Sequence, residues 1–435
     1  FNNEYVLIIE IWFFFFFYVV MKTMLNLVLE VSMKNIPKKS IAIIGGGPAA
    51  LMFACNIDSE KYSVTIYEKN KFLARKFLVA GDGGFNLTHS ESLELLINRY
   101  APNTFLKEAL LNFSNIDFIK WLVGIGIPTF IGTSKRVFPI KGIKPIDVFE
   151  AIMKEIVKNN IDIRTGFEFS GFNNGNPQFL NDGNVVKVDA DFYVFALGGA
   201  SWKKTGSTGS WKEVFESESI KVNEFYPSNC AYKINWSDNI LKSIEGKPIK
   251  NAAFTCGDSK IKGEAVLTTF GIEGSGIYPL SPFIRKQLIE TNKATVLIDF
   301  KPEISYHELV QKFELNKHSS IKEFLLKNLK LTELQIVLLK SVTSKSEYQD
   351  VFVLSKLIKE FPIEIVDFAP IDESISTVGG IDLNELTEHF ELKKIPNTFC
   401  IGEMLDYDAP TGGYLLQSCF SMGKFVSDYL NKKDF

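Results

Sequence analysis

A glycine-rich turn between an apolar strand and a helix is the feature that most constrains how this chain can fold. The segment SIAIIGGGPAALMFACNI places Gly45, Gly47 and Ala50 in a GxGxxA pattern. The first glycine permits a tight turn, the second lets a pyrophosphate approach the backbone, and the small third residue lets helix and strand pack closely. The next predicted strand, 64–67, ends at Glu68, about 20 residues further on, as dinucleotide-binding βαβ units require.

Glu68 and the loop that follows it narrow the choice of dinucleotide. A carboxylate at the end of the second strand can accept both ribose hydroxyls of an adenosine and would repel a 2′-phosphate, which favours FAD or NAD over NADP. The segment ARKFLVAGDGGFNLTHS then supplies two cations, Arg75 and Lys76, and exposed glycine amides at 81–84. A bare NAD domain seldom adds such a second cradle, so the sequence favours FAD.

Two further glycine-rich segments suit the flavin half of the same cofactor. FALGGASWKKTGSTG is predicted to leave a buried strand at Gly198, beneath the cofactor. Near the end of the chain, GEMLDYDAPTGGYLLQ places Glu403 after a strand and Gly412 and Gly413 before a helix. The positive end of that helix would stabilise the electron-rich N1–C2=O edge of a flavin by about 0.3–2 kcal/mol.

The order of predicted elements indicates a discontinuous nucleotide domain with an insertion. We expect an α/β fold: a Rossmann-like FAD-binding domain over 39–225 and 365–435, an inserted β-barrel-like domain over 226–302, and a small helical domain over 303–364. The apolar segment YVLIIEIWFFFFFYVV lies within residues 1–32, where position 1 is Phe and methionines follow at 21, 24 and 33. We interpret 1–32 as a non-native or mis-called extension, with a membrane anchor as the alternative.

Composition argues against several classes of partner. The net charge is −3 and the pI about 6.0, so no basic surface indicates nucleic acid or anionic lipid. The five cysteines form no CxxC pair and the four histidines no metal-binding spacing, so we expect no metal and a reduced, cytoplasmic protein without a membrane partner.

Seven motifs follow one another in a recognisable order: GGGPAALMFA, ARKFLVAGDGGFNLTHS, RVFP, GGASWKKTGSTGSW, GEAVLTTFGIEGSGIY, STVGGI and GEMLDYDAPTGGYLLQ. Over about residues 39–432 the chain resembles the BaiN/YhiN-like bacterial FAD flavoproteins, often called NAD(P)/FAD-dependent oxidoreductases, and in particular their poorly characterised branch with NLTHS. Ala74, Asp82 and Leu197 depart from that family's usual residues. The predicted cofactor-binding residues are Gly45, Gly47, Pro48, Ala49, Glu68, Lys69, Arg75, Lys76, Gly81, Gly84, Asn86, Gly198, Gly402, Glu403, Gly412 and Gly413.

The resemblance and the motifs together predict an FAD-dependent oxidoreductase. It would move a hydride or electron pair between FAD and a small-molecule substrate, with NAD(P)H as a candidate donor although the chain has no second dinucleotide motif. The alternatives are an FAD-dependent RNA-modifying enzyme and a non-enzymatic flavin-binding redox sensor. The catalytic candidates are His89, Arg136, Glu273 and Tyr278.

Overall fold

The computed structural model describes residues 17–24, 37–79, 85–315 and 320–433. The expectation for residues 1–32 therefore falls mostly outside the described residues. Among those that are described, no helix has both the length and the apolar character needed to cross a bilayer.

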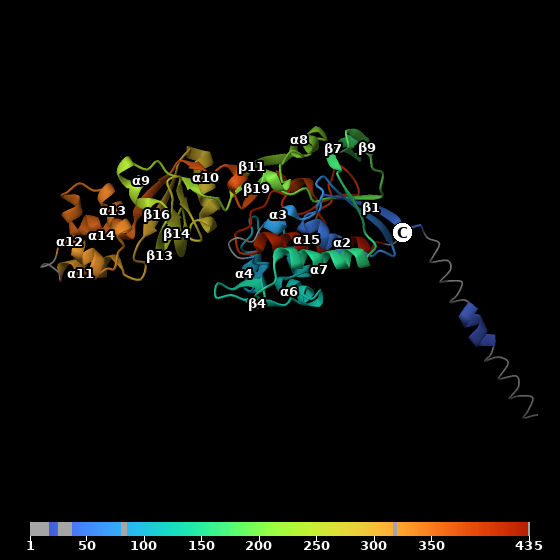
Figure 1. The fold of residues 1–435 in the computed structure, drawn as a ribbon, viewed down its shortest axis with the longest axis horizontal. Coiled ribbons are helices and arrows are strands. Elements are labelled where there is room, and N and C mark those ends of the chain that lie inside the picture. The colour runs from blue at the N-terminus through green and yellow to red at the C-terminus, as the bar shows by residue number, and fades with distance from the viewer. Residues whose placement is uncertain (1–16, 25–36, 80–84, 316–319, 434–435) are drawn as a thin grey trace, which may run out of the picture.

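A five-stranded parallel sheet forms the centre of the first lobe, on the right of Figure 1. Its apolar strands are buried, and Ile41 on the central strand pairs with Val64 on one side and Phe192 on the other. A parallel sheet buried on both faces requires such near-continuous apolar strands. In spatial order the strands are β20 (Thr398–Cys400), β10 (Phe192–Phe195), β1 (Lys39–Ile44), β2 (Tyr62–Glu68) and β6 (Asp162–Thr165).

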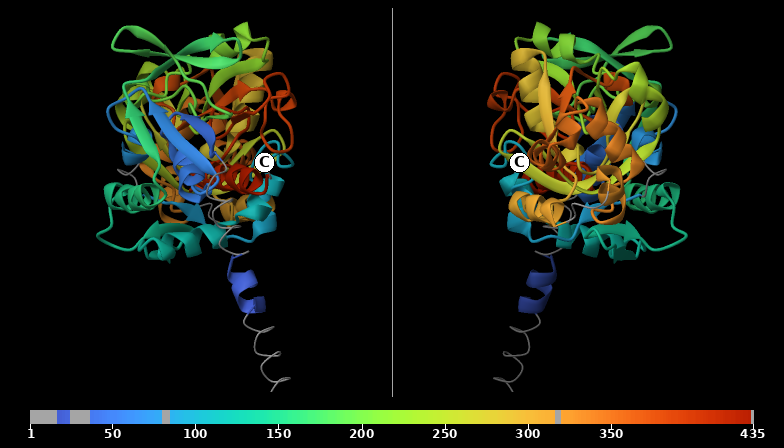
Figure 2. Two further views of the ribbon diagram at one scale, coloured as in Figure 1. Left: turned by 90° about the vertical axis from the view of Figure 1, so that its right-hand side faces the viewer. Right: turned by 90° about the vertical axis from the view of Figure 1, so that its left-hand side faces the viewer.

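Helices cover one face of this sheet and a three-stranded meander covers the other, so that the lobe has three layers (Figure 2). On the meander side, aromatic rings fill the interface: Tyr67 stacks on Phe179, and Phe169 meets Phe195 edge-on. The covering helices are α2 (Pro48–Asn56), α7 (Pro145–Lys158) and α15 (Tyr414–Asn431), and the meander consists of β7 (Glu168–Asn173), β8 (Asn176–Asn181) and β9 (Asn184–Lys187).

Short elements between β2 and β6 complete this lobe, and those labelled α4, β4 and α6 lie below α15 and α7 in Figure 1. They include a small sheet in which Arg136 pairs with His89 and Phe138 pairs with Phe130. The elements are α3 (Arg75–Val79), β3 (Thr88–His89), α4 (Leu93–Ile97), α5 (Lys107–Asn112), α6 (Asn115–Gly124), β4 (Thr129–Ile131) and β5 (Arg136–Pro139), with α8 (Lys212–Ser217) after the meander.

The second lobe is built on a seven-stranded antiparallel sheet that is nearly closed. Its two edge strands, β17 (Phe361–Ile365) and β18 (Asp367–Phe368), are separated in sequence by Val366 alone, so the sheet must curl until its edges approach. Between these edges lie β16 (Ala294–Asp299), β13 (Lys247–Cys256), β14 (Ser259–Leu267), β15 (Gly271–Glu273) and β12 (Tyr232–Lys233).

The helices of the second lobe share one hydrophobic core with this curled sheet. Capping explains several helix starts: the Ser305 and Thr332 side chains each accept a hydrogen bond from the third residue of the helix that follows. The helices are α9 (Asp238–Ile244), α10 (Ser281–Thr291), α11 (Tyr306–Glu314), α12 (Ile321–Lys327), α13 (Glu333–Ser341) and α14 (Val351–Lys359).

A two-stranded ribbon joins the lobes, between them in Figure 1. It pairs β11 (Val222–Ser228) with β19 (Ser376–Ile381) in antiparallel fashion, so the chain enters and leaves the second lobe side by side. The predicted fold class, a Rossmann-like domain with a barrel-like insertion, is confirmed. The exact domain boundaries stay a prediction.

Candidate functional site

A cavity of about 710 Å³ opens where the parallel strands end and the second lobe meets the first. Open α/β sheets bind their ligands at this edge. Predicted cofactor residues from both ends of the chain line this cavity; Gly81 and Gly84 lie outside the described residues. The lining residues on that list are Gly45, Gly47, Pro48, Ala49, Glu68, Lys69, Arg75, Lys76, Asn86, Gly198, Gly402, Glu403, Gly412 and Gly413.

The first glycine turn combines a required backbone shape with open space. Gly45 has φ +98°, and a Cβ there would lie 2.5 Å from the Ala196 carbonyl oxygen, so only glycine fits. Gly47 has φ −81° and ψ 178°, which any residue can adopt. A Cβ on Gly47 would meet only the Ala196 oxygen, at 4.0 Å. Gly47 itself lines the cavity, so a larger side chain at this position would occupy cavity space.

Glu68 is held firmly at the end of β2. Its Oε2 accepts a hydrogen bond from the Gly46 amide at 2.8 Å, and its Oε1 accepts from the Asn70 amide at 2.9 Å and side chain at 2.6 Å. Arg75 in turn donates to Asn70 Oδ1 at 2.7 Å. Each carboxylate oxygen offers two lone pairs, so Glu68 can be oriented by the chain and still accept from a ribose.

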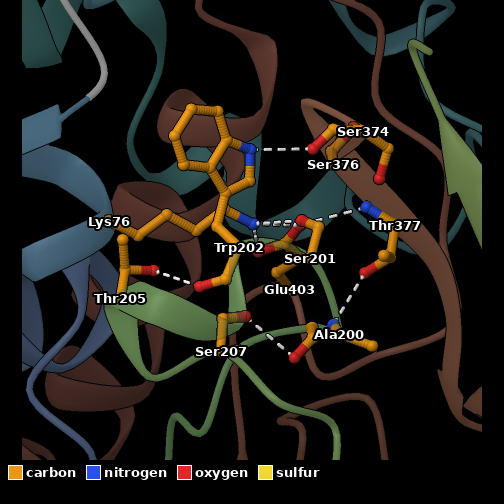
Figure 3. A network of polar contacts seen from close by, with 12 residues as sticks. Lys76, Ala200, Ser201, Trp202, Thr205, Ser207, Ser374, Ser376, Thr377 and Glu403 are labelled. Carbon is orange, nitrogen blue, oxygen red and sulfur yellow. Dashed lines mark hydrogen bonds and ion pairs between the residues drawn. The ribbon is translucent and has the colours of Figure 1, made fainter. Parts of the chain in front are cut away.

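Lys76 and Glu403 meet in the wall of the cavity although they are 327 residues apart (Figure 3). The Lys76 ammonium lies 2.9 Å from Glu403 Oε2 and donates to Ser201 Oγ at 2.8 Å, while the Thr377 amide donates to Glu403 Oε1 at 3.2 Å. The sequence assigned these two residues to separate parts of the cofactor. The structure shows them as one ion pair that fixes the wall between the two ends of the chain.

The loop after Gly198 carries an aromatic residue that sequence analysis missed. Trp202 lines the cavity with φ +62°, and its ring N–H donates to the Ser374 carbonyl at 2.9 Å (Figure 3). The nearby Thr377 hydroxyl accepts from the Ala200 amide at 3.2 Å. The motif GGASWKKTGSTG pointed to this loop, but no spacing rule singles out the tryptophan.

The last helix begins at the cavity without a side-chain cap. Gly413 is its N-cap, with φ +94°, and a Cβ there would come within 2.6 Å of the Thr88 backbone. A Cβ on Gly412 would lie 3.3 Å from Arg136 Nε, which places the guanidinium beside this helix start. Within the described part of the chain, no hydrogen bond or ion pair engages the Arg136 guanidinium, so a cavity-lining cation is available to a ligand.

Tyr278 reaches the cavity from the second lobe. Burial, with a further contribution from the nearby Glu273 carboxylate, raises the pKa of the Tyr278 phenol to about 12. The phenol is therefore a proton carrier at any ordinary pH. Glu273 itself, on β15, is not among the described residues that line the cavity.

His89 also lies outside the described lining of the cavity. Its Nε2 is 3.2 Å from the Ser134 carbonyl oxygen, and its Nδ1 accepts from the Glu91 amide at 3.3 Å, so both ring nitrogens have backbone partners. Burial lowers the pKa of the imidazole. The His89 ring is therefore engaged by backbone groups and is not presented to a ligand in the cavity as described.

Of the three residues that differ from the family's usual ones, the structure describes two, and the third falls outside the described residues. Ala74, at a usual glycine position, has φ +56°, so an alanine adopts the left-handed region there; its amide donates to the Gly46 carbonyl at 2.9 Å. Leu197 lines the cavity. Asp82 is not described.

Among described residues, no three His, Cys, Asp or Glu side chains gather as metal ligands would.

The residues present fit a long dinucleotide. Two helices of different ends of the chain, α2 and α15, direct uncapped amides toward one cavity, which suits a pyrophosphate and an electron-rich ring. The space beside Gly47 would be filled by any larger side chain. The fold and this site define a Rossmann-type flavoprotein of the oxidoreductase class with FAD as its cofactor.

The chain belongs to the HI0933-like family, because the model described as HI0933-like protein Rossmann domain matches residues 39–429. A curated relative is the 3-dehydro-bile acid delta(4,6)-reductase of Clostridium scindens, 23% identical over 412 residues, covering 88% of this chain and 97% of the relative. The ribosomal RNA dihydrouridine synthase of Haemophilus influenzae is 25% identical over 397 residues, covering 87% and 95%.

Among solved structures, the chain is similar to a 3-ketosteroid-delta4-(5alpha)-dehydrogenase from Rhodococcus jostii. That similarity has a TM-score of 0.49 and 12% identity, and covers 92% of this chain and 98% of the other.

Proposed function

We propose that the protein reduces a carbon–carbon double bond conjugated to a carbonyl group in a small molecule, with FAD as the hydride carrier. The observation that carries this proposal is that one cavity, at the meeting of the two lobes, is lined by both the Arg136 guanidinium, which has no partner among the described residues, and the protonated phenol of Tyr278. A cation polarises a carbonyl group and a phenol donates a proton, and such a reduction requires both functions.

Two relatives of different substrate support this reaction class. One is named for reducing a 3-dehydro-bile acid at delta(4,6), and the other for forming dihydrouridine in ribosomal RNA. Both names describe saturation of a double bond that is conjugated to a ring carbonyl. We favour a small molecule for this chain because its net charge is −3, which supplies little attraction for RNA. Reduction of a ribosomal RNA base is the second candidate, supported by the names of the relatives.

The residues around the cavity would divide the cofactor between them. We propose that Gly45, Gly47 and Glu68 hold the adenosine and pyrophosphate, and that Gly412 and Gly413 hold the pyrimidine edge of the flavin. When bound, FAD would supply the hydride that the β-carbon of the substrate accepts. Arg136 would hold the carbonyl oxygen and balance the negative charge that develops there. Tyr278 would give its proton to the α-carbon, so that one hydride and one proton complete the reduction.

Enone reduction can be tested on the holoenzyme without knowing the natural substrate. Anaerobically reduced protein is mixed with cyclohex-2-enone or, as the control, with cyclohexanone, and the flavin absorbance is followed. We expect reoxidation by the enone alone. Arg136→Met should keep FAD and slow this reoxidation about 100-fold, because one donor to the developing oxyanion is lost. Equal rates with both ketones, or an unchanged rate in Arg136→Met, would refute the proposal.

The raised pKa of Tyr278 gives a pH prediction with a definite sign. A phenol whose pKa is about 12 keeps its proton as the pH rises through the ordinary tyrosine value of about 10. The rate of enone reduction should therefore show no decline near pH 10 from this group, whereas Tyr278→Phe should be about 100-fold slower at every pH below about 12. A wild-type decline centred near pH 10 that Tyr278→Phe abolishes would show an unshifted phenol instead.

The electron donor and the compartment complete the proposal. NADH and NADPH are the electron donors to test first, by following the anaerobic bleaching of the flavin absorbance. The nucleotide would bind only transiently, because the sequence contains one dinucleotide motif. We place the reaction in the cytoplasm, since all five cysteines are free thiols, as a reducing compartment allows.

A further inference from the structure

Asn229 occupies an unusual place at the junction of the two lobes. It directly follows β11, is 2% exposed, and still lines the cavity. Its φ of +54° puts it in the left-handed region, which costs free energy for a residue with a side chain, although less for asparagine than for most. Such strain persists only where the surrounding structure holds it, and it gathers at functional sites.

The side-chain amide of Asn229 has a fixed orientation. Its Nδ2 donates to the Ala409 carbonyl at 2.9 Å and to Ser376 Oγ at 2.8 Å. A backbone carbonyl can only accept, so the NH₂ group must face Ala409 and the amide cannot be flipped. Asn229 Oδ1 then has no hydrogen-bond partner among the described residues and is not among their fully enclosed polar atoms. Oδ1 is thus a side-chain acceptor, without a partner among the described residues, on a residue that lines the cavity.

A network from both lobes holds that orientation. Ser228 Oγ accepts from Asn229 Nδ2 at 3.3 Å and donates to Asp408 Oδ1 at 2.7 Å. Asp408 Oδ2 forms a mostly buried ion pair with Arg285 on α10, at 2.5 Å. The acceptor oxygen of Asn229 is thus positioned by the second lobe as well as the first.

Asn229 and Arg136 flank the same short loop, 409–413, which leads into α15. Asn229 bonds to Ala409 at its start, and Arg136 lies beside Gly412 near its end. Among the described residues, an acceptor without a partner thus lies near the start of this loop and a cationic donor without a partner lies near its end. A ligand that carries an acceptor and a donor close together would satisfy both.

We propose that Asn229 Oδ1 accepts a hydrogen bond from an N–H or O–H group of the substrate and so selects conjugated carbonyl compounds that carry such a donor. This inference rests on the proposed enone reduction. It narrows the substrate class to compounds such as unsaturated lactams and uracil-like rings. Binding a compound without the donor would leave a desolvated amide oxygen unpaired, so a site built this way discriminates strongly.

A matched pair of probes isolates that hydrogen bond. The unsaturated lactam 5,6-dihydropyridin-2(1H)-one carries an N–H beside its carbonyl, and its N-methyl derivative does not. We expect the oxidised holoenzyme to bind the N–H lactam at least about tenfold more tightly, measured by the shift of the flavin spectrum. Asn229→Gly, which tolerates the positive φ, should reduce that ratio to about one and keep FAD. Asn174→Gly is the control, because Asn174 also has positive φ (+52°) but lies in the exposed hairpin between β7 and β8.

The outcomes separate this inference from the reaction on which it rests. Equal affinities of the wild type for the two lactams, no flavin shift with the N–H lactam, or a ratio that survives in Asn229→Gly would overturn the role of Asn229. Loss of FAD, or an altered flavin reduction potential, in Asn229→Gly would place this oxygen on the cofactor and overturn it as well. Because binding is measured on oxidised protein, a retained ratio without any enone turnover would reject the reaction and leave Asn229 as a donor-selective contact.

Discussion

Gly47→Leu is expected to give a folded protein that has lost FAD. The backbone at Gly47 is extended, with φ −81°, and a Cβ there meets no atom closer than 4.0 Å, so the fold accommodates the change. The leucine side chain would instead fill the space in front of the uncapped amides of α2, where we propose that the pyrophosphate binds. We expect the Kd for FAD to rise at least about 1000-fold, or about 4 kcal/mol. Flavin absorbance of the purified protein and its melting temperature measure the two effects separately.

A second glycine supplies the matched control for that variant. Gly124 ends α6, is exposed, and has no atom within 4 Å of a Cβ built on it, so Gly124→Leu should keep both FAD and stability. Gly413 is less suitable, because a Cβ there would strike the Thr88 backbone and unsettle the fold. Yellow Gly47→Leu protein with wild-type affinity would show that the cofactor does not approach the first glycine turn.

The sequence could predict those candidate site residues that belong to short contiguous motifs. Gly45, Gly47 and Glu68 belong to one βαβ unit. The spacing of that motif predicts the tight turn, the start of the helix and the carboxylate at the end of the second strand. Gly412 and Gly413 are likewise read from their place before a helix. The fold class followed from the same segments together with the change to strand-like segments from about residue 226.

What the sequence could not give are the contacts between distant segments. Lys76 and Glu403 were each assigned to the cofactor, but nothing in their spacing predicts that they pair with each other. Asn229 and Trp202 owe their places to positive φ angles and to partners in β19 and nearby loops, which only the folded chain brings together. His89 shows the converse, because a residue type with catalytic potential is engaged by backbone groups away from the cavity.

The second lobe shows a limit of a different kind. Its strands were recognised, but closure of the sheet depends on β17 and β18 lying at opposite edges while adjacent in sequence. The helices α11–α14 share a hydrophobic core with that sheet. The hydrophobic periodicity of a helix shows which of its faces is buried, but it does not show which core that face packs against. Strand pairing and helix docking are decided by tertiary packing, which local propensity does not encode.

Arg285→Met is expected to weaken the attachment of the two lobes by about 3–5 kcal/mol, because it leaves the Asp408 carboxylate buried without its partner. The two side chains are 12% and 8% exposed, so water cannot replace the lost charge. Arg285 lies on α10 and Asp408 precedes α15, so the pair joins the second lobe to the loop that carries Gly412 and Gly413. We expect calorimetry to show a lower melting temperature and less coupled unfolding of the lobes.

The double variant Arg285→Met/Asp408→Asn separates an unpaired charge from a lost contact. Removing both charges should cost less than the sum of the single changes, because neither variant group then remains buried and ionised. The exposed pair Lys262–Glu303, with side chains 65% and 80% exposed, is the comparison: Lys262→Met should leave the melting temperature nearly unchanged. Equal effects of Arg285→Met and Lys262→Met would mean that water reaches the junction of the lobes, and Asn229 would then lack the rigid support that its selectivity requires.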